Sequence, residues 1–314
     1  MKRGLGSVNK GISGGIFVFI LLLTLYACQS DQAREDAMPD TPERGRIYVS
    51  ADESFKPIVD ELVKVYESNN SGTEIKVLYK PEAECLTDLL VDSIRMVIAT
   101  RGLLPPEENY IVDSLKLAPQ SMVVARDAIA VIVNPAAQDS IFTMAEIRQI
   151  LQGKFKKNLI PVFDGVKATS TVRFIIDSVL HGDTITSRAM AARSSEAVVD
   201  FVAKNPGTVG FIGVSWIGNK EDTAQVGFLK KVKIAQLEST DVPGGYVLPV
   251  QNNIYLHRYP MVRDLVYIRK EKHKGLGYGF AQFMSGHIGQ LIFKRAYLVP
   301  TQKKYTLRPI RLNE

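Results

Sequence analysis

The sequence predicts an α/β protein of two lobes, each built on a mainly parallel sheet flanked by helices. Short β-branched runs alternate with amphipathic segments from residue 46 to residue 212, which is the pattern of βαβ units. About 270 residues follow the N-terminal leader and its polar linker, and chains of that size commonly split into two lobes. An apolar stretch at 121–133 is too long for one ordinary strand, so we interpret it as two strand pieces joined where the chain crosses between lobes.

The first part of the chain predicts three strands, each followed by a helix. In the first helix, Ile58, Leu62 and Val65 recur at helical spacing and form one apolar stripe. The expected strands cover 46–50, 74–79 and 96–99, and the expected helices cover 55–66, 86–90 and 105–112. This alternation is typical of parallel strands joined by crossover helices.

The second part of the chain continues the same alternation. Thr143 and Glu146 have the spacing of a capping box, so a helix is expected to begin there and to end at Gly153. The remaining expected elements are a strand at 159–163, helices at 169–180 and 195–204, and a strand at 208–212.

The N-terminus has the layout of an export signal that ends at Cys28. Three basic residues precede an apolar run at 16–25, and small residues lead into the cysteine. A cysteine at this point resembles the lipobox of bacterial lipoproteins, which implies cleavage before Cys28, lipidation of that residue and tethering to a membrane surface. The alternative is an uncleaved N-terminal anchor with a chance cysteine. Either way the working domain is expected outside the cytoplasm, lipid-anchored in the cell envelope and facing the periplasm or the exterior.

These observations give an expected domain organisation. It comprises a signal peptide (1–27), a flexible tether (28–44), the first part of lobe 1 (45–125), lobe 2 (126–258) and a return to lobe 1 (259–314).

Composition excludes several classes of function. The leader carries three cations and no acidic residue, so its removal lowers the formal charge from +6 to +3, and no basic block indicates nucleic-acid binding. Cys85 is the only cysteine besides Cys28, so a lipidated chain has no internal disulfide and no thiolate metal site. The four histidines show no i, i+4 pairing, and neither a metal nor another cofactor is expected.

Small hydroxyl residues follow predicted strands at three places where a helix or loop begins. They are Ser54 before Phe55, Thr100 before Arg101, and the run Thr169, Ser170, Thr171. A helix N-terminus has unpaired N–H groups and a partial positive charge, and in open α/β sheets ligands gather at the carboxyl ends of strands. Each hydroxyl could equally cap its own helix, and that alternative stays open.

The order of these motifs resembles the phosphate-binding component of bacterial high-affinity phosphate ABC transporters. The most specific parts are the stretch DAIAVIVNP at 127–135 and the downstream NPGTVGF at 205–211, and the likeness covers most of residues 45–300. The resemblance implies a type II-like periplasmic binding protein in which crossing strands join two α/β lobes that close on one tetrahedral oxyanion. It also implies that the protein serves an ABC permease. We further expect a monomer without enzymatic activity.

The resemblance implies site residues at matching positions. Ser54 and Phe55 match the first anion-binding loop, Thr100 matches a serine after the third strand, and Thr169, Ser170 and Thr171 match a Ser-Gly-Thr at a helix start. The further candidates are Arg101 and Arg173.

The chain departs from the family pattern at two charged positions. Arg95 and Met96 stand where the family has an aspartate near the end of the third strand, and 165–167 stands where the family has an arginine. Lys167 or Arg173 could replace that charge, although a solvated helix face is the simpler expectation for Arg173.

The second loop, at 80–84, also differs because it contains Glu82 and Glu84. We interpret both carboxylates as caps of the following helix, since they would repel an anion if they pointed inward.

Three functional hypotheses follow from the sequence. The first is a lipid-anchored binding protein that captures phosphate or a related oxyanion for uptake, and the second is an envelope interaction or sensing lipoprotein with a divergent pocket on the same fold. The third, a hydrolase that uses either the pair Asp52 and Glu53 or His181, is disfavoured because no nucleophile, base and orienting group can be assembled from the four scattered histidines. Whether Trp216, the only tryptophan, approaches the pocket stays open.

Overall fold

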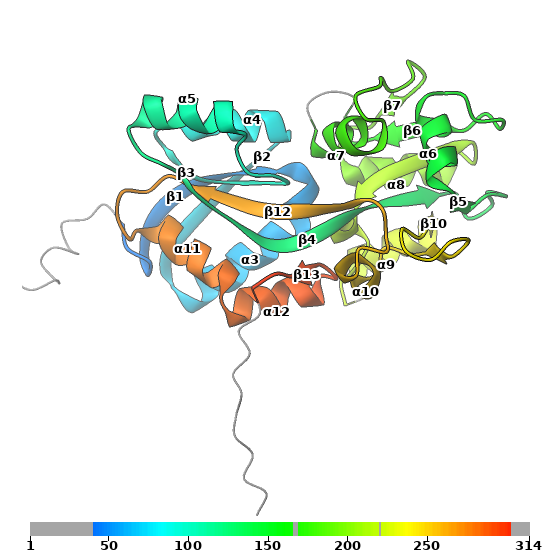
Figure 1. Ribbon diagram of the computed structural model, residues 1–314. Helices are drawn as coiled ribbons and strands as arrows, with labels where there is room; N and C mark the ends of the chain where they lie inside the picture. The colour runs from blue at the N-terminus through cyan, green and yellow to red at the C-terminus, as the bar shows by residue number, and fades with distance from the viewer. Residues whose placement is uncertain (1–39, 166–168, 220, 303–314) are drawn as a thin grey trace, which may run out of the picture.

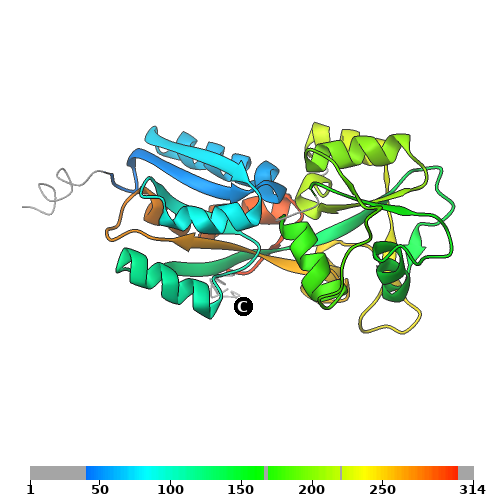
Figure 2. The same cartoon turned by 90° about the horizontal axis from the view of Figure 1, so that it is seen from above.

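Two α/β lobes lie side by side and are joined by long strands in the computed structural model (Figures 1 and 2). The structure describes residues 40–165, 169–219 and 221–302. The predicted signal peptide, Cys28, most of the tether and Lys167 lie outside the described residues. Within them, the main sheet has the strand order β2 (Gly72–Lys80), β1 (Arg44–Asp52), β3 (Ile94–Ala99), β12 (Val262–Arg269), β4 (Gln120–Val133), β8 (Thr208–Gly213), β6 (Ile160–Phe163) and β7 (Met190–Ala191). Strands β13 (Val299–Pro300) and β9 (Lys233–Ile234) also pair with β4.

Lobe 1 is a sheet covered by helices on both faces. Its strands β1, β2 and β3 pair in parallel, and β12 pairs antiparallel to β3. The strands and the helical segments of this lobe are β1 (Arg44–Asp52), η1 (Glu53–Phe55), α3 (Lys56–Asn69), β2 (Gly72–Lys80), α4 (Glu82–Thr87), η2 (Asp88–Leu90), β3 (Ile94–Ala99), α5 (Pro105–Leu115), α11 (Leu276–Ser285) and α12 (His287–Arg295).

Strands β4 (Gln120–Val133) and β12 (Val262–Arg269) pair antiparallel and connect the lobes, as Figure 1 shows. The predicted division of 121–133 into two strand pieces is wrong, because β4 is one continuous strand of 14 residues. Its first half pairs with β12, and its second half pairs with β8 (Thr208–Gly213) in lobe 2. Two different partners therefore account for its length.

Lobe 2 has parallel pairing among β8, β6 and β7, and antiparallel pairing where β4 and β9 join. A small second sheet is formed by β5, β10 and β11. The further elements of this part of the chain are β5 (Ile141–Phe142), α6 (Met144–Leu151), β6 (Ile160–Phe163), α7 (Ser170–Phe174), a π-helical turn (Ile175–Val179), β7 (Met190–Ala191), α8 (Ser195–Lys204), η4 (Val214–Trp216), α9 (Thr223–Lys231), β9 (Lys233–Ile234), β10 (Gln236–Glu238), β11 (Tyr246–Val247), α10 (Gln251–Tyr255) and β13 (Val299–Pro300).

The predicted fold class, an α/β two-lobed architecture with crossing strands, is confirmed, and local signals located most elements. The capping box at α6 is present, with Glu146 N–H donating to Thr143 Oγ1 at 3.1 Å and Thr143 N–H donating to Glu146 Oε2 at 2.9 Å. Within the sheets, parallel pairs occupy the outer part of each lobe, and antiparallel pairs occur where the connecting strands join.

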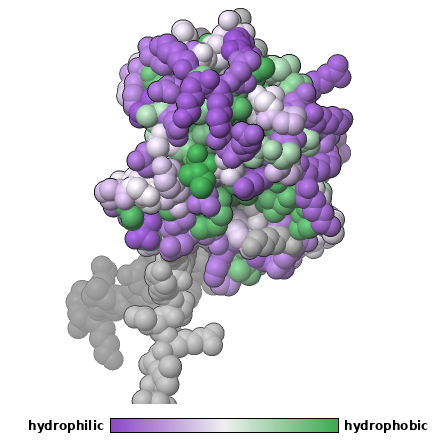
Figure 3. All heavy atoms as spheres, turned by 90° about the vertical axis from the view of Figure 1, so that its right-hand side faces the viewer, coloured by the Kyte–Doolittle hydropathy of each residue, from purple (hydrophilic) through white to green (hydrophobic). Residues whose placement is uncertain are grey.

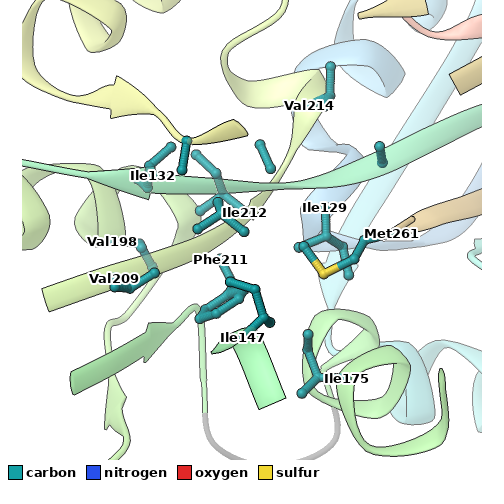
Figure 4. Packing of buried hydrophobic residues seen from close by; sticks show 14 of the residues in the cluster. Ile129, Ile132, Ile147, Ile175, Val198, Val209, Phe211, Ile212, Val214 and Met261 are labelled. Carbon is teal, nitrogen blue, oxygen red and sulfur yellow. The ribbon is translucent and has the colours of Figure 1, made fainter. Parts of the chain in front are cut away.

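Each lobe has its own hydrophobic core. In lobe 2 the core lies between the sheet and its helices, where residues such as Ile132, Phe211, Ile212 and Val198 pack together (Figure 4). In lobe 1, alternate residues of β3 serve the two faces of the sheet, and Cys85 is fully buried in one of the two clusters. Cys85 is therefore a small core residue, and burial raises the pKa of its thiol to about 12.

The surface is mostly hydrophilic at the lobe 2 end, with smaller hydrophobic areas between polar side chains (Figure 3). Among the described residues, none of the helices combines the length and apolar content needed to cross a bilayer.

Candidate functional site

The lobes meet through hydroxyl groups at the start of two helical segments. Ser54 lies in η1, directly ahead of α3, and its N–H donates to Asp52 Oδ1 at 2.8 Å. Ser170 is the first residue of α7, where Thr169 caps the helix by accepting from Val172 N–H at 3.3 Å. Ser54 Oγ and Ser170 Oγ lie 3.2 Å apart across the boundary between the lobes. Both serines are buried.

A buried arginine from the connecting strand β12 joins this contact. Arg263 Nη1 donates to Ser170 Oγ at 3.0 Å, and Arg263 Nε donates to Asp127 Oδ2 at 2.9 Å. Arg263 and Asp127 stand opposite each other in the β12–β4 ladder, and the guanidinium carbon lies 5.2 Å from the centre of the Phe55 ring. We call Arg263, Asp127, Ser54 and Ser170 the hinge cluster.

Gly213, at the end of β8, leaves room for the hinge cluster. A Cβ atom at this position would stand 2.7 Å from Arg263 Nη2 and 3.1 Å from Asp127 Oδ2. Any side chain would therefore displace the ion pair, which gives a physical reason for glycine at this position.

A second set of contacts between the lobes surrounds Glu82. Thr100 N–H donates to Glu82 Oε1 at 2.8 Å, Arg173 Nε donates to Glu82 Oε2, and Arg173 Nη2 donates to Thr100 Oγ1 at 2.7 Å. We call Glu82, Thr100 and Arg173 the interlobe clasp. Burial raises the pKa of the Glu82 carboxyl, but the hydrogen bonds and charge of Arg173 and the hydrogen bonds of Thr100 lower it by more. Glu82 is therefore an ionised partner between the lobes.

Two expectations about these charged residues are wrong. Glu82 does not cap helix α4, because its side chain is 2% exposed and its carboxylate turns inward to Thr100 and Arg173. Arg173 does not lie on a solvated helix face alone, because its guanidinium crosses to the opposite lobe, although it also contacts Asp177 on its own helix.

Carboxylates gather on the open side of the hinge cluster. Burial raises the pKa of Asp52 to about 6 despite the opposing charge of Arg263, and burial together with Asp164 raises the pKa of Glu53 to about 7. Burial also raises the pKa of Asp164, which follows β6 and accepts from Ser195 Oγ at 3.2 Å, and the pKa of Asp127.

A pocket of about 330 Å³ lies at this side of the cleft. Its lining combines residues of both lobes: Asp52, Glu53, Ser54, Tyr79, Lys80, Pro81, Asp164, Thr169 and Arg193. Lys80 Nζ donates to Asp88 at 2.8 Å, so one of the two lining cations is paired within lobe 1. In the described part of the chain, no cluster of histidine, cysteine or carboxylate side chains could hold a metal ion.

Trp216 belongs to the boundary between the lobes. Its indole Nε1–H donates to the Ser54 carbonyl at 2.9 Å, and Ser215 Oγ donates to the same oxygen at 2.8 Å. The open question about Trp216 is thereby answered: it contacts the loop that carries Ser54.

The structure brings most of the residues predicted for the site to one cleft. Ser54 and Ser170 belong to the hinge cluster, Phe55 contacts its Arg263, and Thr171 Oγ1 lies 3.5 Å from Arg263 Nη1. Thr169 lines the pocket, while Thr100 and Arg173 belong to the clasp.

Arg101 has different partners from the other predicted site residues. Its guanidinium binds Glu107 of α5 through two hydrogen bonds, at 2.7 Å and 2.8 Å, and donates to Gly102 O. Sequence reasoning missed Arg263 and Asp127, and it did not assign Asp52 or Asp164 to an anion site. The one available signal was the charged pair Arg126–Asp127, which interrupts an otherwise apolar stretch.

The arrangement can bind a small polar anion by charge and by hydrogen-bond donors. Two helix starts, the hydroxyl of Ser170 and the guanidinium of Arg263 converge from both lobes and from the strand that connects them, next to the Ser54 hydroxyl, which donates to Asp52. Such donors stabilise an oxyanion without a metal ion.

Comparisons with known proteins agree with this architecture. Residues 36–286 match the family model of a PBP superfamily domain. A comparison with curated proteins gave no match.

Solved structures that resemble this chain include several transport proteins. One is a putative phosphate ABC transporter substrate-binding protein with bound phosphate from Clostridium perfringens, with a TM-score of 0.68, 16% identity and coverage of 82% of this chain and 100% of that chain. Another is an ABC-type phosphate transport receptor from Vibrio cholerae, with a TM-score of 0.61, 17% identity and coverage of 81% and 99%. PstS from Borrelia burgdorferi has a TM-score of 0.52, 18% identity and coverage of 81% and 98%.

At these identities the solved structures establish the fold, and the family model establishes the family. The resemblance stated from the sequence is confirmed at that level, and this family consists of binding proteins rather than enzymes. Because the matched region spans most of the chain, the protein belongs to the periplasmic binding protein (PBP) superfamily.

Proposed function

We propose that this protein is a lipid-anchored, extracytoplasmic solute-binding protein that captures phosphate or a related tetrahedral oxyanion between its lobes for uptake. The observation that carries the proposal is the convergence of Ser54, Ser170 and Arg263 at the boundary between the lobes. The two hydroxyl oxygens lie 3.2 Å apart, and the guanidinium donates to one of them at 3.0 Å.

The residues around this convergence are suited to an oxyanion with several acceptor oxygens. The backbone N–H groups at a helix start and the helix dipole favour negative charge, and a hydroxyl adds a further donor. A charge-assisted hydrogen bond from Arg263 is stronger than a neutral one, and closure of the lobes removes water from it. We assign Ser54, Phe55, Thr169, Ser170, Thr171 and Arg263 to the ligand site.

The clasp supports a closure mechanism. Glu82 and Thr100 come from lobe 1 and Arg173 comes from lobe 2, so the two hydrogen bonds that Arg173 donates to them can form only when the lobes approach each other. In the proposed cycle, the bound oxyanion and the clasp together favour the closed form, which an ABC permease receives. The similar Clostridium perfringens protein holds bound phosphate in its crystal structure, which supports phosphate as the first ligand to test.

Binding is tested by calorimetric titration of the full chain in detergent with phosphate and then with sulfate, after unfolding and refolding to remove carried-over ligand. We expect phosphate binding that Ser170→Asp abolishes, because a carboxylate at the helix start would repel the anion. Ser68→Asp, on the exposed face of α3, is the matched control. Unchanged affinity of the Ser170 variant would refute the assignment.

The lipid anchor is tested separately. Cys28→Ser is expected to yield a protein that no longer partitions into detergent with the membrane fraction. Continued partitioning would mean that the apolar segment itself is the anchor.

A second candidate function is an envelope interaction or sensing lipoprotein with an altered pocket. The carboxylates around Arg263 favour it, because Asp52, Asp127 and Asp164 together exceed the charge of one guanidinium. Absence of heat with both phosphate and sulfate would support this alternative.

A further inference from the structure

The cleft contains an excess of buried carboxyl groups around one cation. Asp52, Asp127 and Asp164 all interact electrostatically with Arg263, and none of the three is more than 7% exposed. If all three were ionised, this group would carry two negative charges before any anion arrived. A bound oxyanion would increase that excess in a site from which water is removed.

One carboxylate oxygen of Asp52 accepts hydrogen bonds, and the other has no hydrogen-bond partner in the described part of the chain. Its Oδ1 accepts from Ser54 N–H at 2.8 Å and from the Ser54 hydroxyl. Its Oδ2 is buried and has no hydrogen-bond partner among the described residues. Since Asp52 also lines the pocket next to Ser54, a proton on Oδ2 could be donated to an oxygen of the ligand.

Asp164 approaches the same pocket from lobe 2. Its Oδ2 accepts from Ser195 Oγ at 3.2 Å, while its buried Oδ1 has no hydrogen-bond partner within the described ranges. The negative charge of Asp164 raises the pKa of Asp52, and that of Glu82 does so too. Closure of the cleft would therefore bring two like charges together, that of Asp52 from lobe 1 and that of Asp164 from lobe 2.

The other charged groups near Asp52 do not cancel this excess. Lys80 is paired with Asp88, Lys56 with Asp60, and Arg173 with Glu82. Arg193 lines the pocket from an exposed position, and Glu53 adds a further acidic group. Arg263 is thus the buried cation that opposes the negative charge at this point.

We propose that the cleft binds its oxyanion together with a proton taken from solvent, and that Asp52 holds this proton. The inference rests on the proposed function and specifies the form in which the ligand is held. The proton forms an O–H bond at Asp52 Oδ2, which donates to an oxygen of the anion, and it returns to water when the ligand leaves. No bond within the ligand is made or broken.

The pH dependence of binding follows from this assignment. In the ligand-free cleft, burial raises the pKa of Asp52 to about 6, and a neighbouring anion raises it further. Above about pH 6, binding therefore takes up about one proton, and affinity falls about tenfold for each pH unit. Below that pH the carboxyl group is already protonated, and affinity levels off.

The test counts protons directly. The refolded full chain is titrated with inorganic phosphate in two buffers that differ in ionisation enthalpy, near neutral and at mildly alkaline pH, and the uptake due to phosphate itself is subtracted. We expect an excess uptake of about one proton for the wild type at alkaline pH. Asp52→Asn, which keeps the oxygen that Ser54 needs, is expected to remove this uptake and to bind more tightly than the wild type at alkaline pH.

Two further variants complete the design. Asp164→Asn retains Asp52 and should move the fall in affinity to lower pH, which provides a second reading if the Asp52 variant does not fold. Asp200→Asn, at an exposed ion pair with Lys231, should behave as the wild type.

The outcomes separate the two proposals. Phosphate binding without excess proton uptake, or equal uptake in the wild type and in Asp52→Asn, overturns this inference and leaves the proposed function standing. If the wild type binds neither phosphate nor sulfate, the proposed function fails, and this inference fails with it.

Discussion

The hinge cluster and the interlobe clasp are both built on an arginine, but their charge balance differs. In the clasp, the Arg173 guanidinium meets one buried carboxylate, that of Glu82, besides the exposed Asp177 of its own helix, and the arginine side chain keeps 31% exposure. In the hinge cluster, the Arg263 side chain is 2% exposed and faces Asp127, and it also interacts electrostatically with Asp52 and Asp164. An arginine matched by one buried carboxylate suits closure of the lobes. Where buried carboxylates outnumber the arginine, one of them can take up a proton when an anion approaches.

Their positions in the fold differ as well. In the clasp, Arg173 reaches Glu82 and Thr100 across the boundary between the lobes, whereas Arg263 and Asp127 face each other within the β12–β4 ladder. In the proposed closure, strand pairing therefore maintains the hinge pair, whereas the contacts of Arg173 depend on the approach of the lobes. Substitutions can separate these two roles.

The largest expected effect is that of Arg263→Met. Removal of the guanidinium leaves Asp127 buried without its counter-charge, so the free energy of unfolding should fall by about 3–5 kcal/mol. Oxyanion binding should be lost as well. Urea unfolding and calorimetric titration measure the two effects, and Arg295→Met at the exposed pair with Glu221 should change stability by less than about 1 kcal/mol. Wild-type stability of the Arg263 variant would contradict the central role of this pair.

A smaller effect is expected from pH acting on Asp52. A carboxyl group whose pKa is raised by folding favours the folded state below its unfolded pKa, and this contribution is lost as pH rises through the folded pKa of about 6. The ligand-free protein should lose on the order of 2–3 kcal/mol between about pH 4 and pH 7 from this group. Asp52→Asn should lack this loss and be more stable at mildly alkaline pH, as urea unfolding at a series of pH values would detect. An identical pH profile for both proteins would argue against a perturbed Asp52.

Next in size is Glu82→Gln in the clasp. Loss of the charged partner of Arg173 and Thr100 should lower stability by about 1–2 kcal/mol. Phosphate affinity should fall by less than tenfold, because the variant weakens closure and leaves the donors of the hinge cluster in place. Glu84→Gln, on the exposed side of α4, is the control. A complete loss of binding would mean that the clasp contacts the ligand.

The smallest effect is expected from Trp216→Phe. The indole N–H donation to the Ser54 carbonyl disappears, but Ser215 continues to donate to the same oxygen, so the cost should be about 1 kcal/mol or less. In the wild type, the fluorescence of Trp216 should change when phosphate closes the lobes. If the fluorescence of Trp216 does not change at saturating phosphate, closure does not alter the contact between Trp216 and the Ser54 loop.

Local sequence signals predicted much of the fold. The helix expected at 195–204 is α8, and the capping box at Thr143 starts α6, because these signals depend on neighbouring residues only. The continuous strand β4 was not predicted, since its length depends on two partners that are distant in the sequence.

The sequence predicted only those site residues that lie at the start of a helical segment. Ser54 and Ser170 each follow a strand and open a helical segment, so their sequence neighbourhoods reveal them. Arg263 and Asp127 are 136 positions apart, and strand register alone brings them together. Arg173 was misinterpreted because a charged residue on a helix has the same sequence pattern whether it faces water or another lobe.

The attachment of Arg263 to a connecting strand has a consequence for kinetics. Because β12 bridges the lobes and pairs with β4, the guanidinium would keep its place in the proposed binding cycle while the serine loops separate. An approaching anion therefore meets this charge before closure, so Arg263 should govern the association rate and its dependence on ionic strength. The serine hydroxyls and the clasp act only after the lobes meet, and they should govern the residence time.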